Sequence, residues 1–114
     1  SCILEATGLG GFAAAAAPAV MRSLDKTLQD GIEQTLEMSE IVVTENVNYL
    51  IPALNYKGTP TGIDIRKVAE TGIEPVIHGG MISTTGKRLG AGIARVPYEC
   101  FEKALIAYGD KYGL

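Results

Sequence analysis

Glycines and cationic side chains are concentrated in residues 55–95. Eight of the chain's 14 glycines lie there, and glycine is used where a backbone needs positive φ or must approach a ligand closely. Within the run 86–92, Lys87 and Arg88 stand among flexible backbone amides, an arrangement suited to phosphate or carboxylate. The spacing matches neither a P-loop nor a dinucleotide fingerprint. We therefore predict a small-anion site, with a plain surface turn as the alternative.

His78 is the only histidine of the chain and the candidate catalytic residue. It stands at the end of a predicted strand, directly before Gly79 and Gly80, where side chains of α/β proteins often point into a site. Its near-neutral pKa suits proton transfer. The alternative is a core histidine whose ring is bonded to backbone groups.

Two arginines are candidates for substrate contacts. The planar guanidinium groups of Arg66 and Arg95 can each hold a carboxylate or phosphate through two parallel hydrogen bonds. Alternatively, they pair with Glu70 or Glu99.

Several uncharged or acidic side chains complete the candidate substrate site. Asn46 and Asn48 follow a predicted strand and could orient an amide or carbamoyl group, although asparagine in loops commonly serves turns. Thr59, Thr61 and Asp64 surround a predicted turn and helix start. For Asp64 the alternative is a helix cap without a substrate role.

Composition excludes several classes of protein. At 114 residues the chain fits one domain at most, and 46% apolar against 20% charged residues favour a folded chain. The charge of −3, without a long basic run or aromatic ladder, argues against nucleic-acid binding. Cys2 and Cys100 match no metal-ligand spacing, which indicates no metal site and reduced thiols in a cytoplasmic protein. We assign Cys100 to packing.

The predicted elements are helices around short strands, an α+β arrangement with a Gly-rich loop. Glu5 and Pro18 interrupt the apolar opening, which favours a buried helix over a membrane span. Because the chain starts at Ser1 and enters this segment at once, we expect a piece of a larger α/β protein. The expected elements are a helix within 3–21, a helix capped by Ser23 and ending near Ser39, a strand at 41–44, a turn at 57–62, a helix at 63–71 ending at Gly72, a strand at 74–78, a loop or irregular strand at 81–96, and a helix from Pro97 to about Tyr108.

Segments 57–66, 70–77 and 89–101 together resemble the C-terminal part of a family long known as a domain of unknown function, which includes a subunit of oxamate carbamoyltransferase. The resemblance implies a cytoplasmic multisubunit complex of anaerobic purine breakdown. Its reaction would exchange a carbamoyl group between oxalurate and phosphate, giving oxamate and carbamoyl phosphate. At 78–82 this chain has His-Gly-Gly-Met-Ile where the family has a sequence closer to Asn-Thr-Gly-Ile-Ala, so the role of His78 rests on residue chemistry alone.

The resulting hypothesis is that residues 1–114 form a single C-terminal domain, or domain fragment, of a carbamoyltransferase subunit. No cofactor is assigned, and the expected partners are a small anionic substrate and other subunits. The alternative is a non-catalytic assembly domain that docks partner subunits through its alanine-rich segment and last helix. We expect the anion to contact Arg66, Lys87, Arg88 and Arg95, and the developing oxyanion to meet amides around Gly79, Gly80, Gly90 and Gly92.

Overall fold

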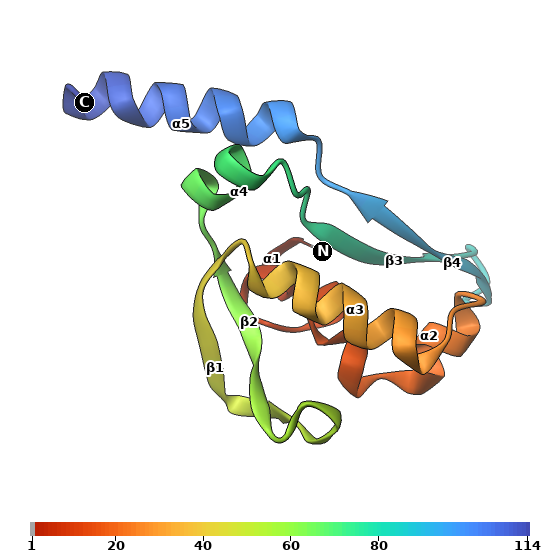
Figure 1. The fold of residues 1–114 in the computed structure, drawn as a ribbon. Coiled ribbons are helices and arrows are strands. Elements are labelled where there is room, and N and C mark those ends of the chain that lie inside the picture. The colour runs from red at the N-terminus through yellow and green to blue at the C-terminus, as the bar shows by residue number, and fades with distance from the viewer. Residues whose placement is uncertain (1) are drawn as a thin grey trace.

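The computed structural model describes residues 2–114, apart from the side chains of residues 2, 81, 82, 88, 89 and 91. Its elements confirm the α+β class (Figure 1). Within the described part, no helix combines the length and apolar character needed to cross a membrane. In chain order the elements are α1 (Cys2–Ala6), the 3₁₀ helix η1 (Gly10–Ala16), α2 (Pro18–Ser23), α3 (Leu28–Ser39), β1 (Val42–Ile51), the 3₁₀ turn η2 (Pro52–Leu54), β2 (Lys57–Ile63), α4 (Ile65–Thr71), β3 (Val76–Ile82), β4 (Arg88–Arg95) and α5 (Tyr98–Tyr112).

The strands form two separate antiparallel hairpins, β1–β2 and β3–β4. The predicted turn at 57–62 is wrong, because these residues form β2 and pair with β1 from Val42↔Ile63 to Ile51↔Lys57. Pro60 is tolerated because a two-stranded sheet leaves each strand one edge without partners, where a missing N–H costs no ladder bond. The expected end of the first strand at residue 44 is also wrong, since β1 continues to Ile51.

Of the two forms expected at 81–96, loop or irregular strand, the β3–β4 hairpin shows the irregular strand, with a register shift between Met81 and Ile82. Its strands pair from Val76↔Arg95 to Ile82↔Arg88, so His78 lies within a strand and not at its end. The turn is closed by the amide of Ser83, which donates to the carbonyl of Lys87 at 2.7 Å. Gly86 takes φ +83° in this turn, a conformation that suits glycine.

The apolar opening is not one continuous helix. Gly8 and Gly10 adopt left-handed φ values of +88° and +61°, which ends α1 and starts η1, and Pro18 opens α2 as its first residue. Glycine and proline therefore divide the segment into three short pieces.

The helix ends test the capping predictions. Ser23 does not cap α3: it is the last residue of α2, and its hydroxyl donates to the carbonyl of Val20. Thr27 caps α3 instead, in a capping box with Asp30. Asp64 caps α4, accepting from the amide of Arg66 at 2.9 Å, but as the N-cap itself and not behind Thr61 in a capping box, so the helix begins at Ile65 and not at Ile63. Gly72 ends that helix at φ +72°, as predicted.

The core lies between η1, α3, the start of β1, α4 and β3. Its buried side chains are Phe12, Met38, Ile41, Val42, Val68 and Val76. The predicted last helix is confirmed as α5, which continues to Tyr112. Tyr98 and Phe101 pack against the core from α5, whereas the rest of this helix extends past α4 (Figure 1). Cys100 is exposed, so its assignment to packing was wrong.

Candidate functional site

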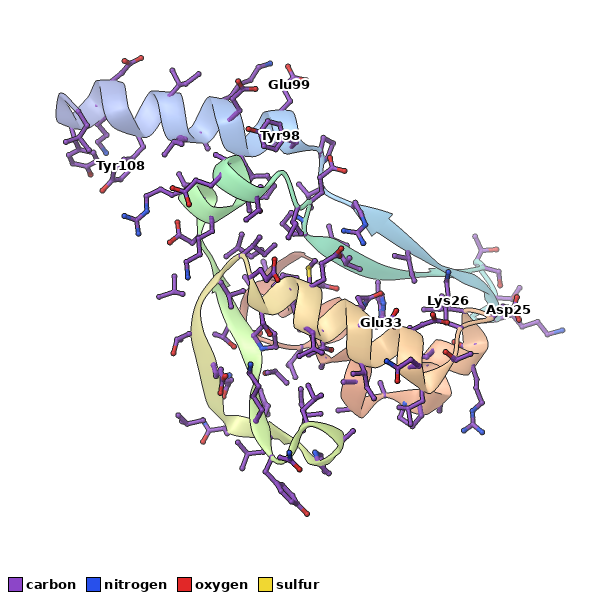
Figure 2. The ribbon with its side chains drawn as sticks, in the orientation of Figure 1. Asp25, Lys26, Glu33, Tyr98, Glu99 and Tyr108 are labelled. Atoms are coloured by element: carbon purple, nitrogen blue, oxygen red, sulfur yellow. The ribbon has the colours of Figure 1, made fainter. Side chains whose placement is uncertain are left out.

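A groove of about 610 Å³ lies between α3 and the β3–β4 hairpin, a size typical of small-molecule sites. We call it the α3–hairpin groove. Apolar side chains of α2, of the segment after it and of β4 contribute part of its wall, and charged side chains contribute most of the rest, with Lys26 and Glu33 marked in Figure 2. Gln34 and Gly92 complete the lining. The apolar members are Met21, Leu24 and Ile93, and the charged members are Lys26, Asp30, Glu33, Glu37 and Arg95.

One face of α3 supplies much of this lining. Asp30, Glu33, Gln34 and Glu37 recur at the three- and four-residue spacing that places side chains on one side of a helix. The buried residues of α3, Gly31, Thr35 and Met38, lie on the side packed against η1 and the core. Burial of that side therefore leaves the polar side of α3 facing the groove.

Arg95 is held at the groove by two contacts. Its Nη2 lies 2.7 Å from Oε1 of Glu37, and its Nη1 donates to the carbonyl of Glu74 at 3.0 Å. A guanidinium has five N–H donors, so these contacts leave donors for a ligand. With Lys26 and Arg95 against three carboxylates, the lining has a formal charge of −1. The groove is thus matched to a ligand that carries both an anionic end and N–H donors.

The pKa of Asp30 is lowered, first by the backbone N–H of Thr27 and then by its hydroxyl. The amide of Thr27 donates to Oδ2 of Asp30 at 2.8 Å. Asp30 is therefore an ionised carboxylate at the edge of the groove.

Behind the groove, Gln34 connects α3 to His78. Nε2 of Gln34 lies 2.9 Å from Nε2 of His78 and donates to the carbonyl of Gly11 at 2.7 Å. Oε1 of the buried Glu5 accepts from the amides of Gly11 and His78 at 3.1 and 3.0 Å. Burial lowers the pKa of His78, and the carboxylate of Glu5 partly opposes this effect. The ring is thus favoured in its neutral form.

The β3–β4 hairpin brings together part of the predicted site. Gly92 and Arg95 of this hairpin line the groove, while Lys87 lies exposed at the turn. The side chain of Arg88 lies outside the described residues. The predicted site residues that share this hairpin are His78, Gly79, Gly80, Arg88, Gly90, Gly92 and Arg95, with Gly79 paired to Gly92.

Two predicted residues lie instead at the start of α4. Nη2 of Arg66 is 3.1 Å from Oδ2 of Asp64, so these two side chains bind each other. Their hydrogen bond lowers the pKa of Asp64 and raises that of Arg66. The predicted pairing of these arginines with Glu70 or Glu99 was wrong. Arg66 forms an ion pair with Asp64, and Arg95 forms one with Glu37.

The remaining four predicted residues lie in the β1–β2 hairpin. Oδ1 of Asn46 accepts from the amide of Asn48 at 2.9 Å, and its Nδ2 donates to the carbonyl of Thr7. Both asparagines lie within β1, at an irregularity between Glu45 and Leu50, and not after the strand. In β2, the hydroxyl of Thr61 donates to the carbonyl of Thr59 at 3.1 Å. These contacts give Asn46 and Thr61 local structural roles.

Sequence reasoning missed Gln34, Glu5, Lys26 and Glu37. Glu5 could have been identified, because it is a single carboxylate in the apolar opening and a buried charge requires polar partners. Gln34 and Glu37 carry no such signal, since polar residues on a helix are ordinary surface residues. Among the described residues, no group of three or more histidine, cysteine or acidic side chains is arranged to hold a metal ion.

Comparison with known proteins relates the whole chain to a segment of larger ones. No family model matches the sequence. In Escherichia coli (strain K12), the uncharacterized protein YahG is 40% identical over 116 residues, covering 100% of this chain and 25% of YahG. The oxamate carbamoyltransferase subunit AllG of the same organism is 38% identical over 117 residues, covering 100% of this chain and 28% of AllG. Over its whole length, this chain is thus similar to a segment of each of these two proteins.

A solved structure agrees with this relationship. The crystal structure of a conserved protein of unknown function from Enterococcus faecalis V583 superposes with a TM-score of 0.82 at 42% identity. The match covers 90% of this chain and 25% of that protein. The chain therefore spans about a quarter of the length of the relatives that it matches.

Proposed function

We propose that this chain is part of a carbamoyltransferase subunit that exchanges a carbamoyl group between oxalurate and phosphate, giving oxamate and carbamoyl phosphate. The observation that carries the proposal is the 38% identity, over the whole chain, to a subunit named for oxamate carbamoyl transfer. The proposed setting is anaerobic purine breakdown in the cytoplasm, within a complex that includes other subunits. The α3–hairpin groove is the proposed contribution of this chain to the substrate site.

The charges of the groove support this substrate class. Oxalurate has a carboxylate at one end and the NH₂ of its carbamoyl group at the other. Arg95 and Lys26 would hold the carboxylate, and Glu33 would accept from the NH₂ group. A purely cationic pocket would suit a simple polyanion better than this mixed lining does. Lys87 and Arg88, beside the hairpin turn, are further candidates for holding phosphate.

The reaction itself requires stabilisation of an oxyanion. A phosphate oxygen attacks the carbamoyl carbon of oxalurate, and the carbon–nitrogen bond to the oxamate moiety breaks as that nitrogen gains a proton. Negative charge develops on the carbamoyl oxygen and is best stabilised by pre-positioned N–H donors. The proposed donors are amides of the glycine-rich hairpin, around Gly79, Gly80, Gly90 and Gly92, together with His78.

The test is calorimetric titration of the full-length protein, with its neighbouring subunits, with carbamoyl phosphate and then oxamate. Arg95→Ala is expected to weaken binding by about 10-fold or more, because it removes a charge-assisted contact of roughly 1.5 to 3 kcal/mol. Arg66→Ala is the matched control, since it removes the same side chain at α4, outside the groove. Binding within about twofold of wild type in Arg95→Ala would refute the groove assignment.

Exposed apolar side chains favour a second candidate function, the assembly domain. Ile106, Tyr108 and Tyr112 of α5 are each more than half exposed. If assembly is the function, Ile106→Ser with Tyr112→Ser should dissociate the complex in sedimentation experiments. A full-length monomer that still binds carbamoyl phosphate would count against it.

A further inference from the structure

The orientation of the Gln34 side chain follows from its contact with Gly11. The Gly11 carbonyl can only accept a hydrogen bond, so the Gln34 atom 2.7 Å away must be the NH₂ group. The reversed amide would place two oxygen lone pairs against each other at that distance. This contact therefore determines which end of the amide also faces His78.

The same NH₂ group determines the protonation of the imidazole. It lies 2.9 Å from Nε2 of His78, and an amide NH₂ has hydrogens to donate but no accepting lone pair. Nε2 must consequently present its own lone pair, which leaves the ring proton on Nδ1. A doubly protonated ring would direct an N–H at the NH₂ group of Gln34.

The other groups around His78 are consistent with a neutral ring. Glu5, from α1, is the charged side chain that acts on it, and its Oε1 is bound by the amides of Gly11 and His78. Gln34 from α3 is uncharged, and Ile93 is the cross-strand partner from β4. Among the described residues, no group accepts a hydrogen bond from Nδ1 of His78. The Nδ1–H thus has no acceptor among the described side chains.

We propose that Gln34 is a positioning residue that keeps His78 neutral with its proton on Nδ1, so that His78 donates a hydrogen bond to the carbamoyl oxygen and does not act as a general base. The catalytic part of this inference rests on the proposed carbamoyl transfer. A neutral imidazole is a suitable donor to a developing oxyanion, because it needs no prior protonation at neutral pH. In this assignment the proton that oxamate gains comes from phosphate or water.

The test observes the tautomer directly, in full-length protein carrying ¹⁵N-labelled histidine. Long-range ¹H–¹⁵N spectra distinguish the two tautomers and the imidazolium, and the His78 signals are identified by their loss in His78→Phe. We expect a protonated Nδ1 and an unprotonated Nε2 at neutral pH. Gln34→Met should shift the ring toward the Nε2–H form that free histidine prefers, and Gln34→Glu should raise the pKa of His78 by about one unit or more.

Gln29→Met is the matched control for the spectra. Gln29 is an exposed glutamine of the same helix whose Nε2 contacts Glu33 at 3.4 Å, so its loss should leave the His78 signals unchanged. A wild-type ring that carries its proton on Nε2, or is doubly protonated at neutral pH, would overturn the inference. So would a ring that keeps its tautomer in Gln34→Met.

Measurements of kcat test whether His78 acts as a hydrogen-bond donor, independently of the tautomer seen in the spectra. His78→Phe should lower kcat by about 100-fold, whereas His78→Gln, which retains an N–H donor but cannot act as a base, should retain much of the rate. Equal losses in both variants would refute the donor role. If the wild-type complex transfers no carbamoyl group while the spectra agree with expectation, the proposed function fails and the Gln34–His78 assignment stands.

Discussion

Replacing Gly31 with alanine should destabilise the protein, although alanine is the better helix former. Gly31 lies buried in α3, where the helix packs against η1. A Cβ added there would lie 2.8 Å from the carbonyl oxygen of Ala14 and 3.1 Å from Cγ of Met21. That oxygen already accepts from the amide of Ala17 within the buried η1 segment. The helix must therefore move away from η1 to accommodate one methyl group.

The size of the effect follows from two opposing contributions. Alanine gains about 1 kcal/mol of helix propensity over glycine. Overpacking a close-packed interior costs about 1 to 3 kcal/mol, and contact with backbone atoms favours the upper half of that range. We expect Gly31→Ala to lower the free energy of unfolding by about 1 to 2 kcal/mol.

Gly109→Ala provides the matched control. Gly109 lies in α5, and an added Cβ would meet only the carbonyl oxygen of Leu114, at an ordinary 3.7 Å. Without a clash, alanine should stabilise by about 0.5 to 1 kcal/mol. Urea unfolding followed by circular dichroism measures both variants, and the midpoint of Gly31→Ala should fall by about 0.5 to 1 M. A midpoint at or above wild type, with Gly109→Ala as expected, would refute the packing argument.

Other predictions concern the first turn of α3 and the core. Thr27→Ala should destabilise the protein by about 1 kcal/mol in thermal melts, because it removes the capping hydroxyl. Thr27→Ser, which keeps a hydroxyl, should retain the wild-type stability. Because the folded pKa of Asp30 lies below its ordinary 3.8, the stability that its carboxylate contributes is present above 3.8 and disappears as the pH falls through the folded pKa. Asp30→Asn should thus be less stable than wild type at neutral pH. In thermal melts at strongly acidic pH, the two proteins should differ less in melting temperature. An equal difference at both pH values would show that the Asp30 carboxylate is not the cause. Phe12→Ala should cost about 3 to 5 kcal/mol, since Phe12 is fully buried, and a loss below about 1 kcal/mol would place Phe12 outside the core.

Local signals predicted the parts of the fold that depend on neighbours in the sequence. Asp64 and Gly72 mark the two ends of α4. Both could be predicted, because a capping side chain and a left-handed C-terminal residue contact backbone groups within one helical turn. The prediction of Ser23 as a cap failed because Ser and Thr are both common capping residues. Thr27 is the actual cap, since it has an acidic residue, Asp30, three positions later, and Ser23 does not. The residues at 57–62 have turn composition, yet pairing with β1 makes them a strand.

The candidate site depended much more on the fold. Arg95 and His78 were identified by residue type alone, but their partners were not. Glu37 precedes Arg95 by more than half of the chain, and Gln34 is separated from His78 by 44 residues. Contacts at such separations leave no periodic or compositional pattern in the sequence, so neither partner could be predicted.

The sequence by itself determined the α+β class, the capping role of Asp64 and Gly72 at α4, the glycine-rich segment that carries His78 and Arg95, and the resemblance to a carbamoyltransferase subunit family. Each of these follows from residue type, short spacing or ordered motifs. Only the tertiary structure decided which side of α3 faces the hairpin, that Arg66 and Arg95 lie in different parts of the molecule, and which nitrogen of His78 faces Gln34. The physical reason is that burial of Gly31, Thr35 and Met38 orients α3 as a whole, and the polar residues on its opposite side then meet partners that are distant in the chain.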